Sequence, residues 1–300
     1  MQNVNQIISK VYYDKSGYGS LKTTLEDVRK TDKSITNNDI KKFFQENVEQ
    51  KKQLKGYNSF IAPYPYYEFQ CDLFFLSDLE KQTYKVGMIM IDIFTKYMVV
   101  VPIKTKLEGD VISGVIECLN LMGGKPEIIY SDDEGSLSSN AINEYYIKKD
   151  IKHIVTRTHA WFAERAIKTF KQALYKRIDD SKDKNIQWID LVYEVILTYN
   201  NKLIHSSTKF TPSNARLKKN ELDVRLNLLL HKKHSRIYPE LNEGDKVKIY
   251  KKKKVGEKER VSYWSDNNYE VETISKSHGQ NNLKIIGLTK QYLRNELLKI

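Results

Sequence analysis

Residues 67–104, YEFQCDLFFLSDLEKQTYKVGMIMIDIFTKYMVVVPIK, hold three runs rich in β-branched and aromatic residues. The runs cover residues 67–76, 84–94 and 96–104, and short polar stretches separate them. Runs of this length and composition, in quick succession, are typical of strands joined by turns. The stretch therefore predicts a three-stranded meander at the start of a folded domain.

The residues that follow alternate between helical and strand patterns. The predicted segments are a helix at 108–124 ending at paired glycines, a strand at 126–132, a helix at 138–150, a strand at 151–157, a helix beginning near 158 and a helix at 185–202. Paired glycines are a normal helix stop. The order βββαβαβαα predicts an α/β domain with a mixed sheet covered by helices.

The regions on either side of this domain have different patterns. The first 55 residues predict two short helices. One is SLKTTLEDVRK, with Ser20 or Thr23 as its cap and a capping box from Thr23 to Glu26, and the other is SITNNDIKKFFQENVEQKK, which begins at Thr36 or Asn37. Two such helices are compatible with a helix-turn-helix unit. The last 60 or so residues alternate short strands with polar turns, as in a small barrel. The predicted division is an N-terminal helical region 1–55, a linker 56–66, an α/β core 67–217, a linker helix 218–237 and a barrel 238–300.

The composition favours a polyanionic partner. Lys and Arg number 50 against 38 Asp and Glu, a net charge of +12. Nucleic acid is a better candidate than a membrane, because the most apolar runs are far shorter than the ~20 residues that span a bilayer. The N-terminus has no pattern of an export signal, and with two cysteines we expect an intracellular protein without disulfides. No cysteines and histidines cluster at zinc spacing, so we expect no structural zinc.

Three acidic residues stand out against their local patterns. Asp72 lies inside the apolar strand predicted at 67–76, and Asp132 ends the strand predicted at 126–132. Glu164 lies at the start of the helix that begins near residue 158. A buried carboxylate needs a cation, hydrogen bonds or a raised pKa. Oxygen ligands from three elements suit Mg²⁺ or Mn²⁺. A simpler interpretation is open for each: backbone N–H groups satisfy many strand aspartates, and Glu164 and Lys168 would form an ordinary exposed ion pair.

Several segments together resemble a known family. The segments are CDLFFL, IDIFTKYMVVVPIKTK, IIYSDDEGSL, THAWFAERAIKTFK and YNNKLIHSSTKFTPSNA, in that order. They resemble the core of the retroviral-type DDE integrase superfamily, and within it the integrases of Maverick/Polinton elements. The resemblance covers roughly residues 60–220 and implies an RNase H-like mixed-sheet core; the C-terminal segment resembles, less specifically, the SH3-like β-barrel of the same family.

The resemblance implies site residues. Asp72, an aspartate of the YSDD segment and Glu164 match the catalytic, metal-binding triad of the family. Strand register favours Asp132 for the second position, whereas counting back from the following glycine favours Asp133. Lys168 and Lys171 match positions that hold the donor DNA end, and Arg165 is placed to contact phosphate or to form a surface ion pair. Apart from the resemblance, the local pattern of the C-terminal region makes Lys246, Lys248, Lys251 and Lys252 candidates for binding the DNA backbone, and an ordinary solvated hairpin or a nuclear-import signal is equally open.

The implied activity is DNA integration. Two Mg²⁺ or Mn²⁺ ions would support trimming of the 3′ ends of element DNA and their joining to target DNA. The implied partners are double-stranded element ends, target DNA and further copies of the chain, as a dimer or tetramer on DNA. The implied place of action is the host nucleus, or a virus-like particle.

Two alternatives remain at this point. One is a decayed or domesticated copy that only binds DNA, and the other is an RNase H-like nuclease without strand transfer. The presence of all three carboxylates speaks against decay. A basic C-terminal module and a helical N-terminal unit favour joining, because a simple nuclease need not hold two DNAs together.

Overall fold

The computed structural model describes residues 4–48, 60–156, 160–183, 185–251, 263–277 and 280–300. The chain divides into two compact units, Met1–Lys55 and Gly56–Ile300. This boundary coincides with the end of the predicted N-terminal region. The predicted linker begins outside the described residues, and the finer division of the second unit stays a prediction.

The N-terminal unit contains three helices, α1 (Val4–Tyr12), α2 (Leu21–Thr31) and α3 (Asn37–Asn47). They pack around a small apolar core of Ile8, Val28, Ile35, Ile40, Phe43 and Phe44. Helix α1 was not predicted, and a helix-turn-helix unit is not confirmed. Ser20, one of the two predicted caps, is the N-cap of α2, whereas the reciprocal capping pair is Thr36 with Asp39 at the start of α3 and differs from the predicted pair of Thr23 with Glu26.

The second unit is built on a five-stranded mixed sheet. Its strands are β1 (Glu68–Phe75), β2 (Val86–Asp92), β3 (Met98–Ile103), β4 (Ile128–Asp132) and β5 (Lys152–Thr156), in the order β3-β2-β1-β4-β5. The first three strands pair antiparallel, so the predicted meander is confirmed. Strand β4 is parallel to both β1 and β5, which makes the sheet mixed, as predicted.

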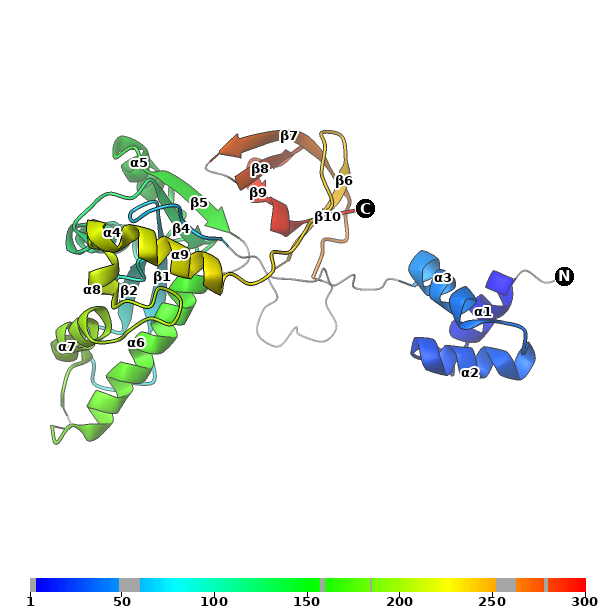
Figure 1. The fold of residues 1–300 in the computed structure, drawn as a ribbon, viewed down its shortest axis with the longest axis horizontal. Coiled ribbons are helices and arrows are strands. Elements are labelled where there is room, and N and C mark those ends of the chain that lie inside the picture. The colour runs from blue at the N-terminus through cyan, green and yellow to red at the C-terminus, as the bar shows by residue number, and fades with distance from the viewer. Residues whose placement is uncertain (1–3, 49–59, 157–159, 184, 252–262, 278–279) are drawn as a thin grey trace. The chain divides into compact units, whose positions relative to one another are not determined.

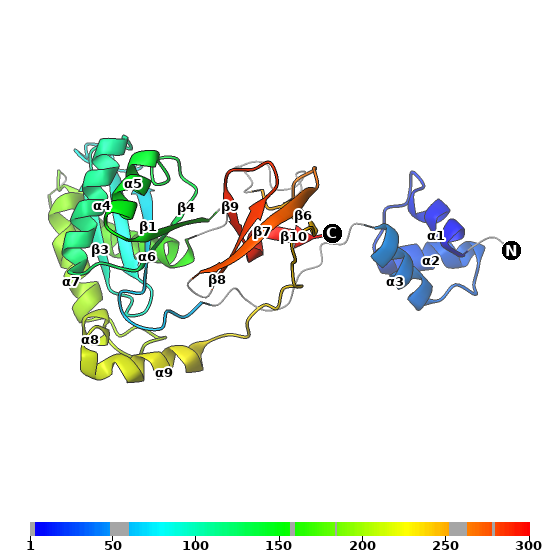
Figure 2. The ribbon, with the colours of Figure 1, turned by 90° about the horizontal axis from the view of Figure 1, so that it is seen from above.

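Helices cover both faces of this sheet (Figures 1 and 2). One apolar core joins the sheet to α4 (Glu108–Met122) and α5 (Asn140–Lys148), and the other joins it to α6 (Trp161–Asp180) and α7 (Trp188–Asn201). Helix α4 ends at Gly123, whose φ of 67° is the left-handed conformation that glycine adopts without strain. The predicted alternation of helices and strands is confirmed.

The alternation of side chains along β1 decides which residues face α6. Phe69, Cys71 and Leu73 belong to the core under α4 and α5, whereas Phe74 belongs to the core under α6 and α7. Because side chains alternate between faces in a strand, the even-numbered Asp72 lies on the α6 face together with Phe74. The central strand therefore presents a carboxylate beneath the helix that carries Glu164.

The chain after α7 forms two short helical segments, α8 (Pro212–Ala215) and η1 (Lys218–Asn220), then α9 (Glu221–His231). A second sheet follows, with β6 (Lys246–Ile249), β7 (Tyr269–Ser277), β8 (Gln280–Ile285), β9 (Gln291–Leu293) and β10 (Leu297–Lys299) in the order β10-β6-β7-β8-β9, and η2 (Arg294–Glu296) precedes β10. This sheet is open among the described residues, so an SH3-like barrel is not confirmed. Within those residues, no helix is long and apolar enough to cross a membrane.

Candidate metal centre

Two of the predicted carboxylates meet where β4 ends beside the middle of its parallel neighbour β1. Cys71 of β1 pairs with Ser131 of β4, so the next residues, Asp72 and Asp132, lie side by side. Strand β4 ends at Asp132, where the chain turns into the loop before α5. The carboxyl ends of parallel strands are where α/β sheets collect their ligand sites.

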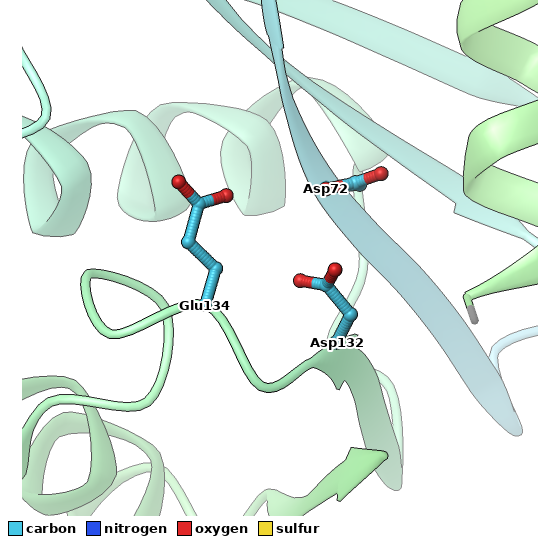
Figure 3. A group of neighbouring side chains, drawn as sticks. All are labelled: Asp72, Asp132 and Glu134. Atoms are coloured by element: carbon cyan, nitrogen blue, oxygen red, sulfur yellow. The ribbon is translucent and has the colours of Figure 1, made fainter. Parts of the chain in front are cut away.

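A third carboxylate reaches the same place from the loop after β4. Glu134 joins Asp72 and Asp132 in a group that offers one ligand oxygen each, all within 4.8 Å of one another (Figure 3). All three side chains are partly buried. An oxygen-only set of carboxylates, open on one side to water and to a phosphate group, is the donor set that Mg²⁺ and Mn²⁺ prefer. The residues present therefore fit a divalent metal site.

The electrostatics of Asp72 agree with this assignment. Desolvation by burial raises the pKa of Asp72 to about 7, and the charge of Asp132 adds to the shift, followed by those of Glu134 and Glu164. A hydrogen bond from the backbone N–H of Leu73, at 2.8 Å, acts in the opposite direction. Crowded carboxylates repel one another, so a bound cation would relieve a cost that the fold already carries.

Asp133 and Glu134, the two loop residues that follow Asp132, have different partners. Asp133, the alternative to Asp132, is paired with Lys290, whose Nζ lies 2.9 Å from both carboxylate oxygens. Glu134 accepts from Lys106 Nζ at 3.0 Å while its carboxylate stays in the acidic group. The structure thus brings Asp132, and not Asp133, to Asp72.

Glu164 lies apart from this group. It is exposed in the first turn of α6, and its carboxylate is not among the three that meet. It is still near enough for its charge to contribute to the raised pKa of Asp72. The structure therefore assembles two of the three predicted carboxylates directly and places the third at the edge of the same region.

Glu134 was missed by the sequence analysis. The only signal was a third acidic residue two positions after Asp132. Glu134 lies beyond the end of β4, so strand periodicity does not fix the direction of its side chain. The loop was therefore interpreted only as a connection to the next helix.

The predicted DNA-binding residues of α6 have unequal surroundings. Lys168 is exposed and makes no hydrogen bond or ion pair with any residue that the structure describes. Lys171 is half-buried, and its Nζ donates to the backbone carbonyl of Phe75 at 2.6 Å, where β1 ends. Arg165 is exposed next to Glu164. A role in binding DNA stays a prediction for all three.

The predicted basic residues of the second sheet lie on and after β6. Lys246 is exposed and Lys248 partly buried, while the alternating Val247 and Ile249 are buried. Lys251 forms an ion pair with Asp266 at 2.7 Å. Lys252 lies outside the described residues. Their role in binding DNA stays a prediction.

Comparison with solved structures places the fold. A chain of the cryo-EM structure of the simian T-cell lymphotropic virus intasome, in complex with PP2A regulatory subunit B56 gamma, matches with a TM-score of 0.62. The match covers 99% of this chain and 98% of that one, at 13% identity. The protein shares the fold of that intasome chain.

Two further similarities concern the HTLV-2 integrase catalytic core domain. Its structures in complex with magnesium, in a trimeric and a dimeric form, match 51% and 52% of this chain and 98% and 99% of theirs at 21% identity. Their TM-score of 0.46 is too low to establish a common fold. No protein-family profile and no curated protein matches the sequence.

Proposed function

We propose that the protein is a DNA integrase, a metal-dependent polynucleotidyl transferase that trims the 3′ ends of element DNA and joins them to a target. The observation that carries this proposal is the meeting of Asp72, Asp132 and Glu134 at the carboxyl end of β4, beside the central strand β1, on a fold shared with an intasome chain. The net charge of +12 supports a nucleic-acid substrate.

Asp72 and Asp132 are the proposed fixed ligands, because both come from strands of the central sheet. Two divalent ions held there would lower the pKa of the attacking water or 3′-hydroxyl and stabilise the charge that develops on the leaving oxygen. No side-chain nucleophile is needed, since the attacking group is water in the first reaction and the freed 3′-hydroxyl in the second. The carboxylates hold and orient the reacting groups.

Glu164 is the proposed third ligand of the working site, as the family resemblance implies. Its position in the first turn of α6 supports this, because α6 packs on the face of β1 that presents Asp72. Glu134 is held by Lys106 in the described structure and would then serve as a neighbouring carboxylate that steers water or metal. These two glutamates can be separated by experiment.

The decisive experiment incubates the purified chain with labelled element ends, a plasmid target and Mg²⁺ or Mn²⁺. We expect trimmed ends and ends joined to plasmid from the wild type, and neither from Asp72→Asn or Asp132→Asn. Glu164→Gln should also lose both products, whereas Glu134→Gln and Asp133→Asn should retain them at reduced rates. DNA affinity should change little in all five variants.

Other outcomes point to other functions. Trimming without joining would favour an RNase H-like nuclease, and DNA binding without either product would favour a decayed or domesticated DNA-binding protein. Loss of activity in Glu134→Gln with retention in Glu164→Gln would move the third ligand to Glu134. The same proposal includes three further parts: a relationship to the integrases of Maverick/Polinton elements, a DNA-binding role for the second sheet, and action in the nucleus or in a virus-like particle.

A further inference from the structure

A buried polar cluster lies on the α6 face of the central sheet, behind the acidic group. Its members are Glu68 and Gln70 of β1 and Lys96 of the β2–β3 turn. Gln70 and Lys96 contact Phe162 of α6. Glu68, Gln70 and Lys96 are 1%, 6% and 4% exposed. Polar side chains in an apolar core are costly unless they make specific interactions, so these three call for a physical reason.

Gln70 connects β1 to the first turn of α6. Its Oε1 accepts a hydrogen bond from the backbone N–H of Phe162 at 2.9 Å, and its Nε2 donates to Glu68 Oε1 at 3.2 Å. The first N–H groups of a helix lack partners within the helix, and a capping side chain normally supplies one. Ala160, the N-cap of α6, has no such side chain. A glutamine from the sheet thus supplies the missing acceptor.

Lys96 reaches the same turn of α6 from the other side of the cluster. Its Nζ lies 4.0 Å from the centroid of the Phe162 ring, and it donates to the backbone carbonyl of Ile93. An ammonium over an aromatic face is attracted by the negative face of the ring, and more strongly where water is excluded. Burial lowers the pKa of Lys96 to about 7, and the charges of Asp92 and Glu68 act in the opposite direction and favour the ammonium.

The backbone makes lysine an expensive choice at this position. Lys96 has a φ of 66°, in the left-handed region that is strained for most residues other than glycine. Burial of an ammonium adds a further cost. Glycine or asparagine would suit the turn better, so the side chain of Lys96 contributes something that the turn itself does not require.

The position of the cluster indicates what that contribution is. Phe162 is two residues before Glu164 in α6, and Gln70 is two residues before Asp72 in β1. Gln70 and Asp72 share one face of β1, since strand side chains alternate. One hydrogen bond therefore joins the helix that carries Glu164 to the strand that carries Asp72, and one cation–π contact joins the same helix turn to the β2–β3 turn.

We infer that Gln70 and Lys96 are positioning residues of the metal centre, which hold the first turn of α6 against the sheet and so keep Glu164 at the edge of the acidic group. This inference rests on the proposed function for its catalytic consequence. Its structural part concerns Phe162 alone and can be judged without any reaction. Supporting groups around a metal site commonly change metal affinity or activity by 10–100-fold when removed.

The test uses Gln70→Met in the full chain, with Gln82→Met as a matched control. Gln82 also makes two side-chain hydrogen bonds: its Oε1 accepts from the backbone N–H of Trp188 at 2.8 Å and its Nε2 donates to Ile186 O at 3.1 Å. Gln82 thus supplies the acceptor at the start of α7, a helix with no proposed ligand. Both variants lose the same kind of contact, and only one is expected to disturb the site.

Three readouts are expected to separate the variants. Gln70→Met should speed amide hydrogen exchange at Phe162, weaken Mn²⁺ binding roughly tenfold and lower kcat by roughly 10- to 100-fold with KM for DNA nearly unchanged. Gln82→Met should leave all three near wild type. Lys96→Met should follow Gln70→Met, and Lys96→Arg should restore most of kcat, because it retains the cation over the ring.

The outcomes distinguish this inference from the proposed function. A wild type that binds Mn²⁺ but makes no product would refute the proposed function. The positioning role would still be tested in that case, by comparing Mn²⁺ affinity and amide exchange at Phe162 between Gln70→Met and the wild type. Equal Mn²⁺ affinity and exchange in Gln70→Met and Gln82→Met would overturn it. So would a loss of kcat that is the same in both variants, or a wild type that binds no Mn²⁺.

Discussion

Ser131, the residue before Asp132, is fixed by a short chain of hydrogen bonds. Its Oγ lies 2.9 Å from His153 Nε2, and His153 Nδ1 lies 2.7 Å from Asn143 Oδ1. Burial lowers the pKa of His153 to about 4, so the ring is neutral at pH 7. These hydrogen bonds join β4, β5 and α5 at the residue that precedes Asp132. Carboxylate placement thus depends on a residue that touches no carboxylate.

This neutral histidine makes stability depend on pH in a defined direction. The unfolded chain binds a proton at His153 below about pH 6.5, whereas the folded chain resists it until about pH 4. Stability is therefore lost as pH falls through this window, by about 2 kcal/mol between pH 7 and pH 5 from this group. In His153→Gln, the unfolding free energy measured with urea should therefore fall by about 2 kcal/mol less between pH 7 and pH 5 than in the wild type.

The control is His234→Gln, which removes an exposed histidine outside the sheet. It should leave the pH dependence of the unfolding free energy as in the wild type. An equal change in both variants would mean that His153 is not protected from protonation in the folded state.

At the scale of elements, the strands and helices of the second unit followed from periodicity. The apolar runs of β1, β2 and β3 and the helical pattern of α6 were long and regular, so local pattern and final structure agree. The site was predictable as far as it lay on these elements, which was true of Asp72 and Asp132. Glu134 lies on a loop, where backbone conformation and not periodicity decides which way a side chain points.

Other differences have equally local causes. Helix α1 is short, and its apolar residue Ile8 is buried only by packing against α2 and α3, so the local pattern alone does not predict the helix. Ser20 and Thr23 both suit an N-cap, so composition alone could not choose between them. The closure of the second sheet depends on strand pairing over long sequence separations, which short alternating runs do not specify.

Helix α6 offers a direct comparison of two lysines. Lys171 holds the carbonyl of Phe75, whereas Lys168 has no partner among the described residues. We expect Lys168→Ala to make the slope of log affinity for DNA against log salt shallower by about one unit, with unchanged stability. Lys171→Met should instead lower the unfolding free energy by about 1–3 kcal/mol, because a charge-assisted hydrogen bond is lost.

Fluorescence anisotropy over a salt series and urea unfolding measure the two quantities on the same preparations. If Lys171→Met flattens the salt slope as much as Lys168→Ala does, DNA draws the Lys171 ammonium away from Phe75. If neither variant changes the slope, both lysines belong to an ordinary solvated helix face.

At the scale of the whole molecule, joining both ends of an element requires two active sites at a fixed separation. One acidic group serves one DNA end, and a symmetric assembly is the simplest way to hold two. Helix α9 offers apolar surface for this purpose. It buries Val224 and Leu228 on its own unit and leaves four leucines between 49% and 86% exposed, at positions 222, 226, 229 and 230. Contiguous exposed apolar side chains commonly mark an interface.

We therefore expect at least a dimer, and a tetramer where both donor ends are bound, with weaker association in the absence of DNA. The double variant Leu222→Glu and Leu226→Glu places two charges on the exposed face of α9, so it should leave one chain per DNA end by light scattering. It should keep trimming of single ends and lose paired joining, because only joining needs two sites. Ile147→Glu, which charges an exposed apolar residue of α5 (75% exposed), is the control and should assemble normally. Paired-end complexes of wild-type mass from the α9 variant would show that another surface holds the copies together.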